Sequence, residues 1–393
     1  MDAPSTADIR DAVALGHDLS GDLPALDVGP RLQAAQEIVL GCRARPDDAF
    51  EALLVTDLLN ICALSGFTGS AARMVIWPDR AVFVTDGRYE ERAAEELANS
   101  GCTAEIVVRR TIKEQNDAIG ELIVGIDLLG LEDANVTWKA LRSYDTVFGT
   151  VQLVPAGPIV EDLRRTKSTA ELVRLARASA IADAAFLDIW ATLAEQPSER
   201  EFADHLESRM RAYGADDVSF SSIVASGPNG SRPHHEPGSR RVVEGDAVIC
   251  DFGALVCGYH SDTTRTVYVG EPSKAQLRHF GVVRKAQAAG IDAVKTGAGG
   301  AAIDAICRRV IADVGWDEYF STGTGHGSGL QIHEEPWLGK TSTSVLAHGD
   351  ITTVEPGVYI PGEAGVRIED SMVVTDEGPV LLTRLPYDLV CGL

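Results

Sequence analysis

The 393-residue sequence contains no CxxC pair, and its seven cysteines are widely scattered. An odd, dispersed set argues against a disulfide framework and is typical of small buried thiols in a reducing compartment. No apolar stretch is long enough to span a bilayer, and the first 27 residues lack the basic start and apolar run of a secretory signal. We therefore expect a cytoplasmic protein that does not bind membranes.

Positive charge is also scarce. Lysine and arginine total 35 against 58 acidic residues, which gives a formal net charge of −23 at pH 7. Such a surface repels phosphate backbones, so nucleic acid is not an expected partner. Apolar residues make up 45% and charged residues 24%, ordinary values for a globular protein, and these exclude collagen-like, coiled-coil and largely disordered chains.

The pattern along the chain predicts three segments. Residues 1–27 are polar and acidic, and we expect a loose leader there. Residues 28–162 alternate short apolar strands with helices, which predicts a smaller α/β domain. Residues 163–393 show two helices followed by strands, and then the same order again. This predicts an α+β domain of two related halves, with a site between them.

Each half of the second domain carries a pair of acids within strand-like segments. Asp251 in VICDFG is followed by Asp262, and Glu355 in TTVEPGVYI is followed by Glu369, each time across a glycine-containing turn. The members of a pair can therefore face each other across a hairpin. A single strand carboxylate is usually solvent-facing or salt-bridged. Four near one core repel each other unless cations balance them, so the set predicts two divalent metal ions.

Histidines near these acids complete the candidate site. His326 lies in the glycine-rich segment STGTGHGSGLQIHEEP, and His333 follows in the same segment. We expect the glycines to let the backbone approach an ion or substrate closely. His234 lies in a loop directly after a strand, and its neighbour His235 could take the same role. Oxygen-rich ligation with one imidazole suits Mn²⁺, Co²⁺, Fe²⁺ or Zn²⁺ better than a thiolate site would.

A family resemblance covers most of the chain, from about residue 50 to 385. The segments DFG, GYHSDTTRT, GTGHGSGLQIHEEP, VEPGVYIPG and GVRIEDSMVVT, in this order, resemble the motifs of the pita-bread metallopeptidases. Before them, LLVTDLLNICALSGFTGSAA and FVTDGRYEERA resemble the N-terminal domain of aminopeptidase P, prolidase and creatinase. The resemblance implies a pita-bread catalytic domain preceded by a smaller creatinase-type N-terminal domain.

The resemblance also implies a centre of two divalent ions. We expect Mn²⁺, with Co²⁺, Zn²⁺ and Fe²⁺ as alternatives. The implied ligands are Asp251, Asp262, His326, Glu355 and Glu369. Asp262 and Glu369 would bridge the two ions, and a water or hydroxide between them would be the nucleophile.

Further roles follow from the same resemblance. Glu355 would take the proton of the nucleophile, while His234 and His333 would bind the substrate, stabilise the oxyanion and move protons toward the leaving nitrogen. Arg367 would hold a ligand carboxylate in place. One position departs from the pattern: many relatives have a histidine four residues before that of the GHG motif, where this chain has Thr322. This change puts substrate anchoring in question, but not metal binding.

The implied activity is that of an Xaa-Pro aminopeptidase, which removes the residue that precedes a proline at position two. An Xaa-Pro dipeptidase is the alternative, because the same ligands serve both. A non-catalytic binding protein on the same fold is a third interpretation, although such proteins typically lose ligands that this chain keeps. The expected partners are proline-containing peptides and, by the habit of the family, a second copy of the chain in a homodimer.

Overall fold

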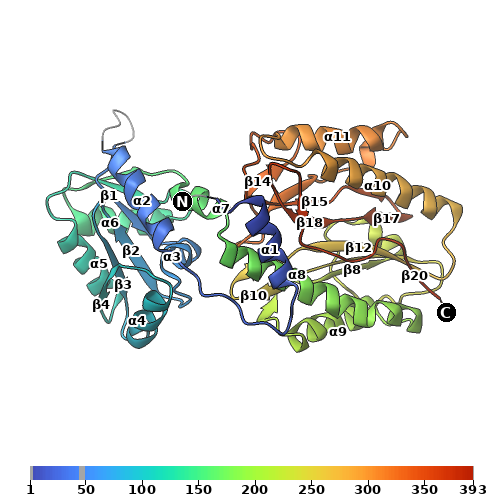
Figure 1. Cartoon of the computed structure of the whole chain (residues 1–393), viewed down its shortest axis with the longest axis horizontal. Coiled ribbons are helices and arrows are strands. Elements are labelled where there is room, and N and C mark those ends of the chain that lie inside the picture. Colours follow the sequence, from blue (N-terminus) through green and yellow to red (C-terminus); the bar gives the residue numbers. More distant parts are fainter. Residues whose placement is uncertain (1–2, 44–48, 393) are drawn as a thin grey trace. The chain divides into compact units, whose positions relative to one another are not determined.

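The computed structural model describes residues 3–43 and 49–392. Within them the chain forms two compact units, divided between Arg164 and Arg165 (Figure 1). The first unit comprises Pro24–Arg164, and the second comprises Ala3–Leu23 together with residues 165–392. None of the helices in these ranges combines the length and apolarity needed to cross a bilayer.

The first unit is built around one six-stranded sheet. Its strands are β1 (Ala52–Val55), β2 (Ala72–Ile76), β3 (Ala81–Thr85), β4 (Glu105–Val108), β5 (Leu128–Leu131) and β6 (Gln152–Pro155). They lie in the order β4-β3-β2-β1-β5-β6. The three central strands β1, β2 and β3 are antiparallel, whereas β4, β5 and β6 each run parallel to a neighbour.

Helices precede, connect and follow the strands of this sheet. They are α2 (Gly29–Cys42), α3 (Leu58–Ser65), α4 (Glu90–Asn99), α5 (Ile112–Leu122), α6 (Trp138–Phe148) and α7 (Ile159–Arg165). Strand β3, with the sequence AVFVT, is buried along its whole length. A continuous apolar run of this kind is typical of a strand covered on both faces, and it explains why this segment could be predicted from the sequence.

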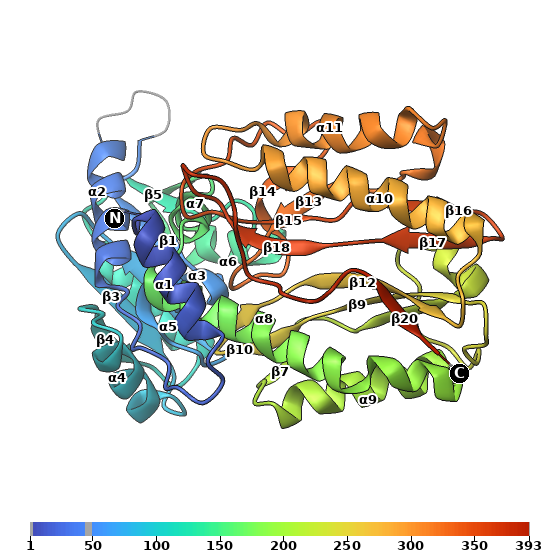
Figure 2. The ribbon, with the colours of Figure 1, turned by 45° about the vertical axis from the view of Figure 1, so that its right-hand side comes forward.

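The second unit carries two pairs of helices with strands between them. Its helices are α1 (Thr6–Gly16), α8 (Thr169–Ile189), α9 (Glu199–Ala212), α10 (Lys274–Ala293) and α11 (Gly300–Ala312). Figure 2 shows α8 and α9 on one side of the strands and α10 and α11 on the other. From α8 onward, two helices precede a set of strands, and this order then repeats. The mixture of helices with mainly antiparallel strands confirms the α+β prediction.

The strands of this unit form several short, mainly antiparallel sheets. Those of the first half are β7 (Asp217–Val218), β8 (Ile223–Ser226), β9 (Ala247–Phe252), β10 (Ala254–Val256), β11 (Tyr259–His260) and β12 (Thr263–Val269). Those of the second half are β13 (Gly325–Gly327), β14 (Glu334–Leu338), β15 (Ile351–Val354), β16 (Gly357–Ile360), β17 (Ala364–Arg367), β18 (Asp370–Val373), β19 (Val380–Leu381) and β20 (Leu389–Cys391). Strand β9 pairs with β12, and β15 pairs with β18, and both pairings are antiparallel.

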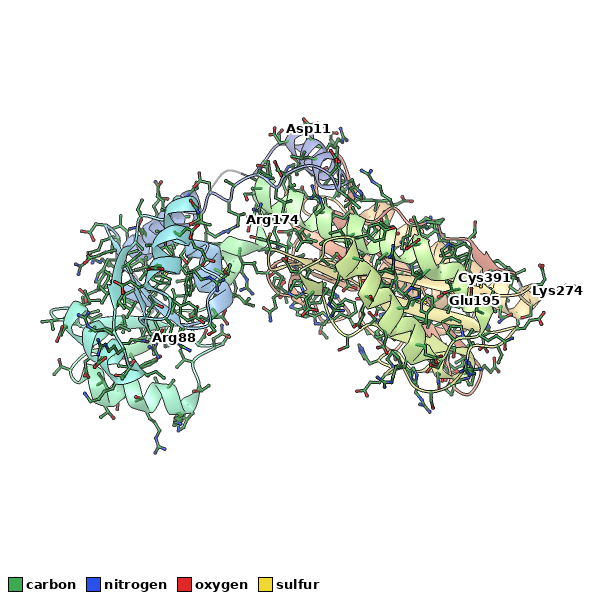
Figure 3. All side chains as sticks on the ribbon, turned by 90° about the horizontal axis from the view of Figure 1, so that it is seen from below. Asp11, Arg88, Arg174, Glu195, Lys274 and Cys391 are labelled. Carbon is green, nitrogen blue, oxygen red and sulfur yellow. The ribbon has the colours of Figure 1, made fainter. Side chains whose placement is uncertain are left out.

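The N-terminal segment differs from the loose leader that we expected. Thr6–Gly16 form helix α1, which Ser5 caps, and the helix belongs to the second unit. Its buried face has helical spacing and consists of Ile9, Ala12, Val13 and Gly16. A Cβ atom on Gly16 would lie 2.4 Å from Cβ of Ala176 on α8, so the two helices are in tight contact. Asp11 projects away from this contact (Figure 3), and such acidic residues concealed the apolar stripe.

The packing of α1 predicts a measurable contribution to stability. Ile9 is fully buried, whereas Leu15 on the same helix is 44% exposed. We expect Ile9→Ala to lower the free energy of unfolding of the second unit by about 2–4 kcal/mol, because it leaves a cavity in the core. The matched control Leu15→Ala should cost less than about 1 kcal/mol. Denaturant unfolding measures both; equal, negligible effects would show that α1 does not pack in solution.

Candidate metal centre

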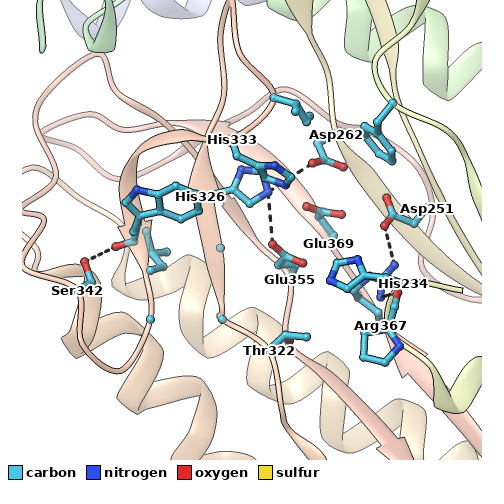
Figure 4. Close-up of a pocket in the computed structure, with 18 of the residues that line it drawn as sticks. His234, Asp251, Asp262, Thr322, His326, His333, Ser342, Glu355, Arg367 and Glu369 are labelled. Carbon is cyan, nitrogen blue, oxygen red and sulfur yellow. Dashed lines mark hydrogen bonds and ion pairs between the residues drawn. The ribbon is translucent and has the colours of Figure 1, made fainter. Parts of the chain in front are cut away.

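The structure brings the five predicted ligands together on the floor of one pocket in the second unit (Figure 4). Asp251 lies on β9, and Asp262 immediately precedes β12. Glu355 directly follows β15, Glu369 directly precedes β18, and His326 is the central residue of β13. The pocket has a volume of about 810 Å³. Residues from both halves of the unit therefore meet at one place, as the hairpin spacing predicted.

Three of these side chains are buried within ligand distance of a common point. Asp262, His326 and Glu369 each offer one atom, and these atoms lie within 4.8 Å of one another. Nε2 of His326 is 3.5 Å from a carboxylate oxygen of Asp262 and 3.5 Å from one of Glu355. Nδ1 of the same ring lies 3.0 Å from the carbonyl of Gly327, which can only accept a hydrogen bond. The proton is therefore assigned to Nδ1, which leaves Nε2 free to bind a cation.

The electrostatics of the floor favour a cation. Burial and then the charges of neighbouring carboxylates raise the pKa of Asp262 and Glu369 well above the usual range. Burial chiefly raises the pKa of Glu355 to about 7. Within the described residues, Oδ1 of Asp251 and Oε1 of Glu369 are buried without a hydrogen-bond partner. Hard oxygen donors with one imidazole are the ligands that divalent transition ions accept, so this set fits such ions.

Arg367 fixes the orientation of the Asp251 carboxylate at one edge of the floor. Its guanidinium donates to Asp251 at 2.6 Å, to the hydroxyl of Tyr359 at 2.8 Å and to Oγ1 of Thr264 at 3.1 Å. Thr264 in turn donates to Glu369 at 2.7 Å. Two of the four carboxylates are thereby fixed in orientation by neutral or positive partners, and their remaining oxygens face the pocket.

The histidines that were predicted to contact substrate divide into two groups. His234 and His333 line the pocket, and the ring of His333 lies 4.4 Å from that of His326 in an edge-to-face arrangement. His235 points elsewhere, with Nε2 2.8 Å from a carboxylate oxygen of Glu199. The structure therefore removes His235 as an alternative to His234 at the pocket.

The glycines around His326 also serve a purpose in strand packing. A Cβ atom on Gly325 would lie 2.1 Å from the carbonyl oxygen of Thr353, and one on Gly327 would lie 2.2 Å from that of Glu335. These glycines let β13 approach the neighbouring strands β14 and β15 closely, and Gly325 also lines the pocket. This packing positions His326. The close approach of this backbone to an ion or substrate stays a prediction.

Sequence reasoning missed three residues at this site. Thr264 follows Asp262 by two positions, so strand alternation could have placed both on one face. Tyr359, the partner of Arg367, carried no separate signal. Trp337 would ordinarily be assigned to a core, yet it is 44% exposed at the pocket. Thr322, the position that departs from the family pattern, also lines the pocket.

Comparison with known proteins places this geometry in a family. Residues 173–376 match metallopeptidase family M24, and residues 46–166 match the creatinase/prolidase N-terminal domain. The uncharacterised peptidase YqhT of Bacillus subtilis is 41% identical over 340 residues, which cover 86% of this chain and 95% of that protein.

Solved structures agree with these matches. The Xaa-Pro dipeptidase from Bacillus anthracis has a TM-score of 0.87 at 36% identity and covers 93% of this chain and 100% of its own. The X-Pro aminopeptidase from Thermotoga maritima has a TM-score of 0.80 at 30% identity, with coverage of 88% and 98%. The matches confirm the pita-bread catalytic region and the creatinase-type N-terminal domain. The chain therefore belongs to metallopeptidase family M24 and is a metal-dependent hydrolase.

Proposed function

We propose that this enzyme is an Xaa-Pro aminopeptidase, which releases the N-terminal residue from peptides with proline in the second position. The observation that carries the proposed metal-dependent hydrolysis is the convergence of Asp251, Asp262, His326, Glu355 and Glu369 on one pocket floor. The relatives support the choice of bond, because their names specify Xaa-Pro substrates. Such a bond needs a dedicated enzyme, since its nitrogen carries no hydrogen for a general peptidase to bind.

The proposed cofactor is a pair of divalent ions, with Mn²⁺ as the expected metal. These five side chains would hold them, and Asp262 and Glu369 would be shared between the two ions. When bound, the ions supply Lewis acidity and lower the pKa of water at neutral pH. Arg367 keeps Asp251 oriented toward the centre through their 2.6 Å contact.

The other residues of the pocket handle substrate and protons. Glu355 takes the proton of the attacking water, because its carboxylate lies at the floor and remains partly open to the pocket. His234 and His333 also line the pocket, with His333 beside His326, and there they bind the substrate carbonyl and pass a proton to the proline nitrogen as it leaves. A cytoplasmic location and a homodimer stay predictions from the sequence.

An Xaa-Pro dipeptidase is the second candidate, because several relatives carry the name Xaa-Pro dipeptidase or prolidase. A matched pair of substrates, an Xaa-Pro dipeptide and the Xaa-Pro-Yaa tripeptide with the same first residue, separates the two. With added Mn²⁺ we expect release of the first residue from the tripeptide and loss of that release with a chelator. Cleavage of the dipeptide alone would move the assignment to a dipeptidase.

The metal assignment predicts a selective loss in one variant. Asp262→Asn should lower kcat/KM by roughly a thousandfold, because it removes a charge that holds the ions. Without the ions the enzyme loses several kcal/mol of transition-state stabilisation. Bound metal, measured by elemental analysis of the dialysed protein, should fall in parallel.

The matched control is Asp183→Asn, a buried aspartate on α8 outside the pocket lining. Burial raises the pKa of Asp183 to about 7, so a neutral side chain suits its surroundings. This variant should keep its metal content and turnover. Near-normal turnover of Asp262→Asn, or equal losses in both variants, would argue against the assignment.

A further inference from the structure

The loop that carries His234 is organised around one buried carboxylate that lies outside the pocket lining. This loop, residues 227–238, follows β8 and begins with a short 3₁₀ helix at Gly227–Ser231. The carboxylate belongs to Glu199, the first residue of α9, and its side chain is fully buried. A buried carboxylate is costly unless hydrogen bonds compensate it, so its partners indicate its role.

Each oxygen of Glu199 binds one end of this loop. Oε1 accepts hydrogen bonds from the N–H and the hydroxyl of Ser226, at 2.9 and 2.7 Å, and from the amide of Asn229 at 2.9 Å. Oε2 accepts from the N–H of Gly238 at 3.1 Å and lies 2.8 Å from Nε2 of His235. A single carboxylate therefore joins the start of the loop to its end.

The ionisation of Glu199 determines the direction of its contact with His235. Burial alone would raise the pKa of Glu199, but hydrogen bonds from Asn229, Ser226 and His235 outweigh burial and lower this pKa to about 2. The carboxylate is therefore ionised at neutral pH and can only accept, so Nε2 of His235 carries the proton. Hydrogen bonds to an ionised acceptor are stronger than those between neutral groups, and they hold the loop firmly.

The residues on both sides of His234 are anchored. The side chain of His234 lines the pocket, whereas that of His235 is turned to Glu199. On the other side, Nη1 of Arg367 donates to the carbonyl of Pro233 at 3.2 Å. His234 thus lies between one anchor on α9 and one at the metal centre.

Close backbone packing holds the loop from a third direction. A Cβ atom on Gly365 of β17 would lie 1.9 Å from the carbonyl oxygen of Gly230, so the loop and this strand are in direct contact. A side chain that is supported in this way keeps one position relative to the groups around it, as catalysis requires.

We propose that Glu199 is a positioning residue, which fixes loop 227–238 so that His234 is held in place at the metal centre. Glu199 lies outside the pocket lining, so its effect on the reaction passes through the loop. The inference rests on the proposed contact of His234 with the substrate in Xaa-Pro hydrolysis. A misplacement of about 1 Å in such a group can lower the rate by roughly a hundredfold.

The first test is Glu199→Gln in the full-length, Mn²⁺-loaded enzyme with an Xaa-Pro-Yaa tripeptide. The amide replaces one of the two acceptor oxygens with a donor, so one end of the loop loses its partner. We expect kcat/KM to fall by roughly tenfold to a hundredfold, with bound metal unchanged in elemental analysis. The control Glu201→Gln lies on the same turn of α9, where its exposed side chain accepts from the N–H of Ser198. Since glutamine can also accept this hydrogen bond, the control should keep wild-type kinetics.

A double-mutant cycle distinguishes positioning from general support of the fold. In the His234→Ala background, Glu199→Gln should lower kcat/KM by less than about threefold further, because the side chain that it positions is already absent. Equal fold-losses in the wild-type and His234→Ala backgrounds would overturn the inference.

A milder pair of variants at His235 tests the same point if Glu199→Gln fails to fold. His235→Leu removes one hydrogen bond to Glu199 and should lower kcat/KM by roughly threefold to tenfold. His235→Gln keeps an N–H donor at this position and should recover most of that loss. Equal losses in the two variants would contradict the inference.

The outcomes also distinguish the inference from the activity on which it rests. If the metal-loaded wild-type enzyme cleaves no Xaa-Pro substrate, the proposed activity is wrong, and the inference fails with it. If the wild-type enzyme cleaves the tripeptide and either Glu199→Gln or His234→Ala is fully active, the inference is overturned while Xaa-Pro hydrolysis stands.

Discussion

The repulsion among buried carboxylates is the constraint on which the catalytic unit depends. Four acids share one pocket floor, where burial and mutual charge raise the pKa of Asp262 and Glu369. The protein itself compensates only part of this cost, through Arg367 on Asp251 and Thr264 on Glu369. Divalent ions would supply the remainder, so the repulsion that disfavours the carboxylates alone is also what would make the cluster bind such ions strongly.

The scaffold explains how such a cluster is held. Each half of the unit contributes two acids through an antiparallel pairing, β9 with β12 and β15 with β18. Strand β13 carries His326 between them, and its two flanking glycines permit the close strand contacts that fix its position. Rigid strands rather than loops therefore carry all five side chains of the centre or lie immediately beside them, as precise ligand geometry requires.

Much of the arrangement of the carboxylates could be predicted from the sequence, because spacing along a strand determines which residues face each other. The sequence spacings from Asp251 to Asp262 and from Glu355 to Glu369 predicted a hairpin in each half. The structure has an antiparallel strand pairing at each place, with two further short strands in each connection. Other features depend on contacts between distant segments, which no local pattern reveals. The packing of α1 on α8 and the contact of His235 with Glu199 are of this kind.

Trp337 shows that prediction from local sequence patterns is limited in the same way at the pocket itself. Its sequence context, HEEPW on a short strand, does not distinguish a core residue from an exposed one. Its exposure follows from the loop 339–344, which fixes the backbone and leaves the indole uncovered. The composition of a pocket wall, and hence the choice among substrates, is decided by tertiary structure more than by motif.

The most direct test of the central claim is anomalous scattering from crystals of the Mn²⁺-loaded enzyme, measured above and below the manganese absorption edge. The account predicts two peaks on the floor of the pocket, with oxygens of Asp262 and Glu369 between them. A single peak, or peaks away from these carboxylates, would contradict it.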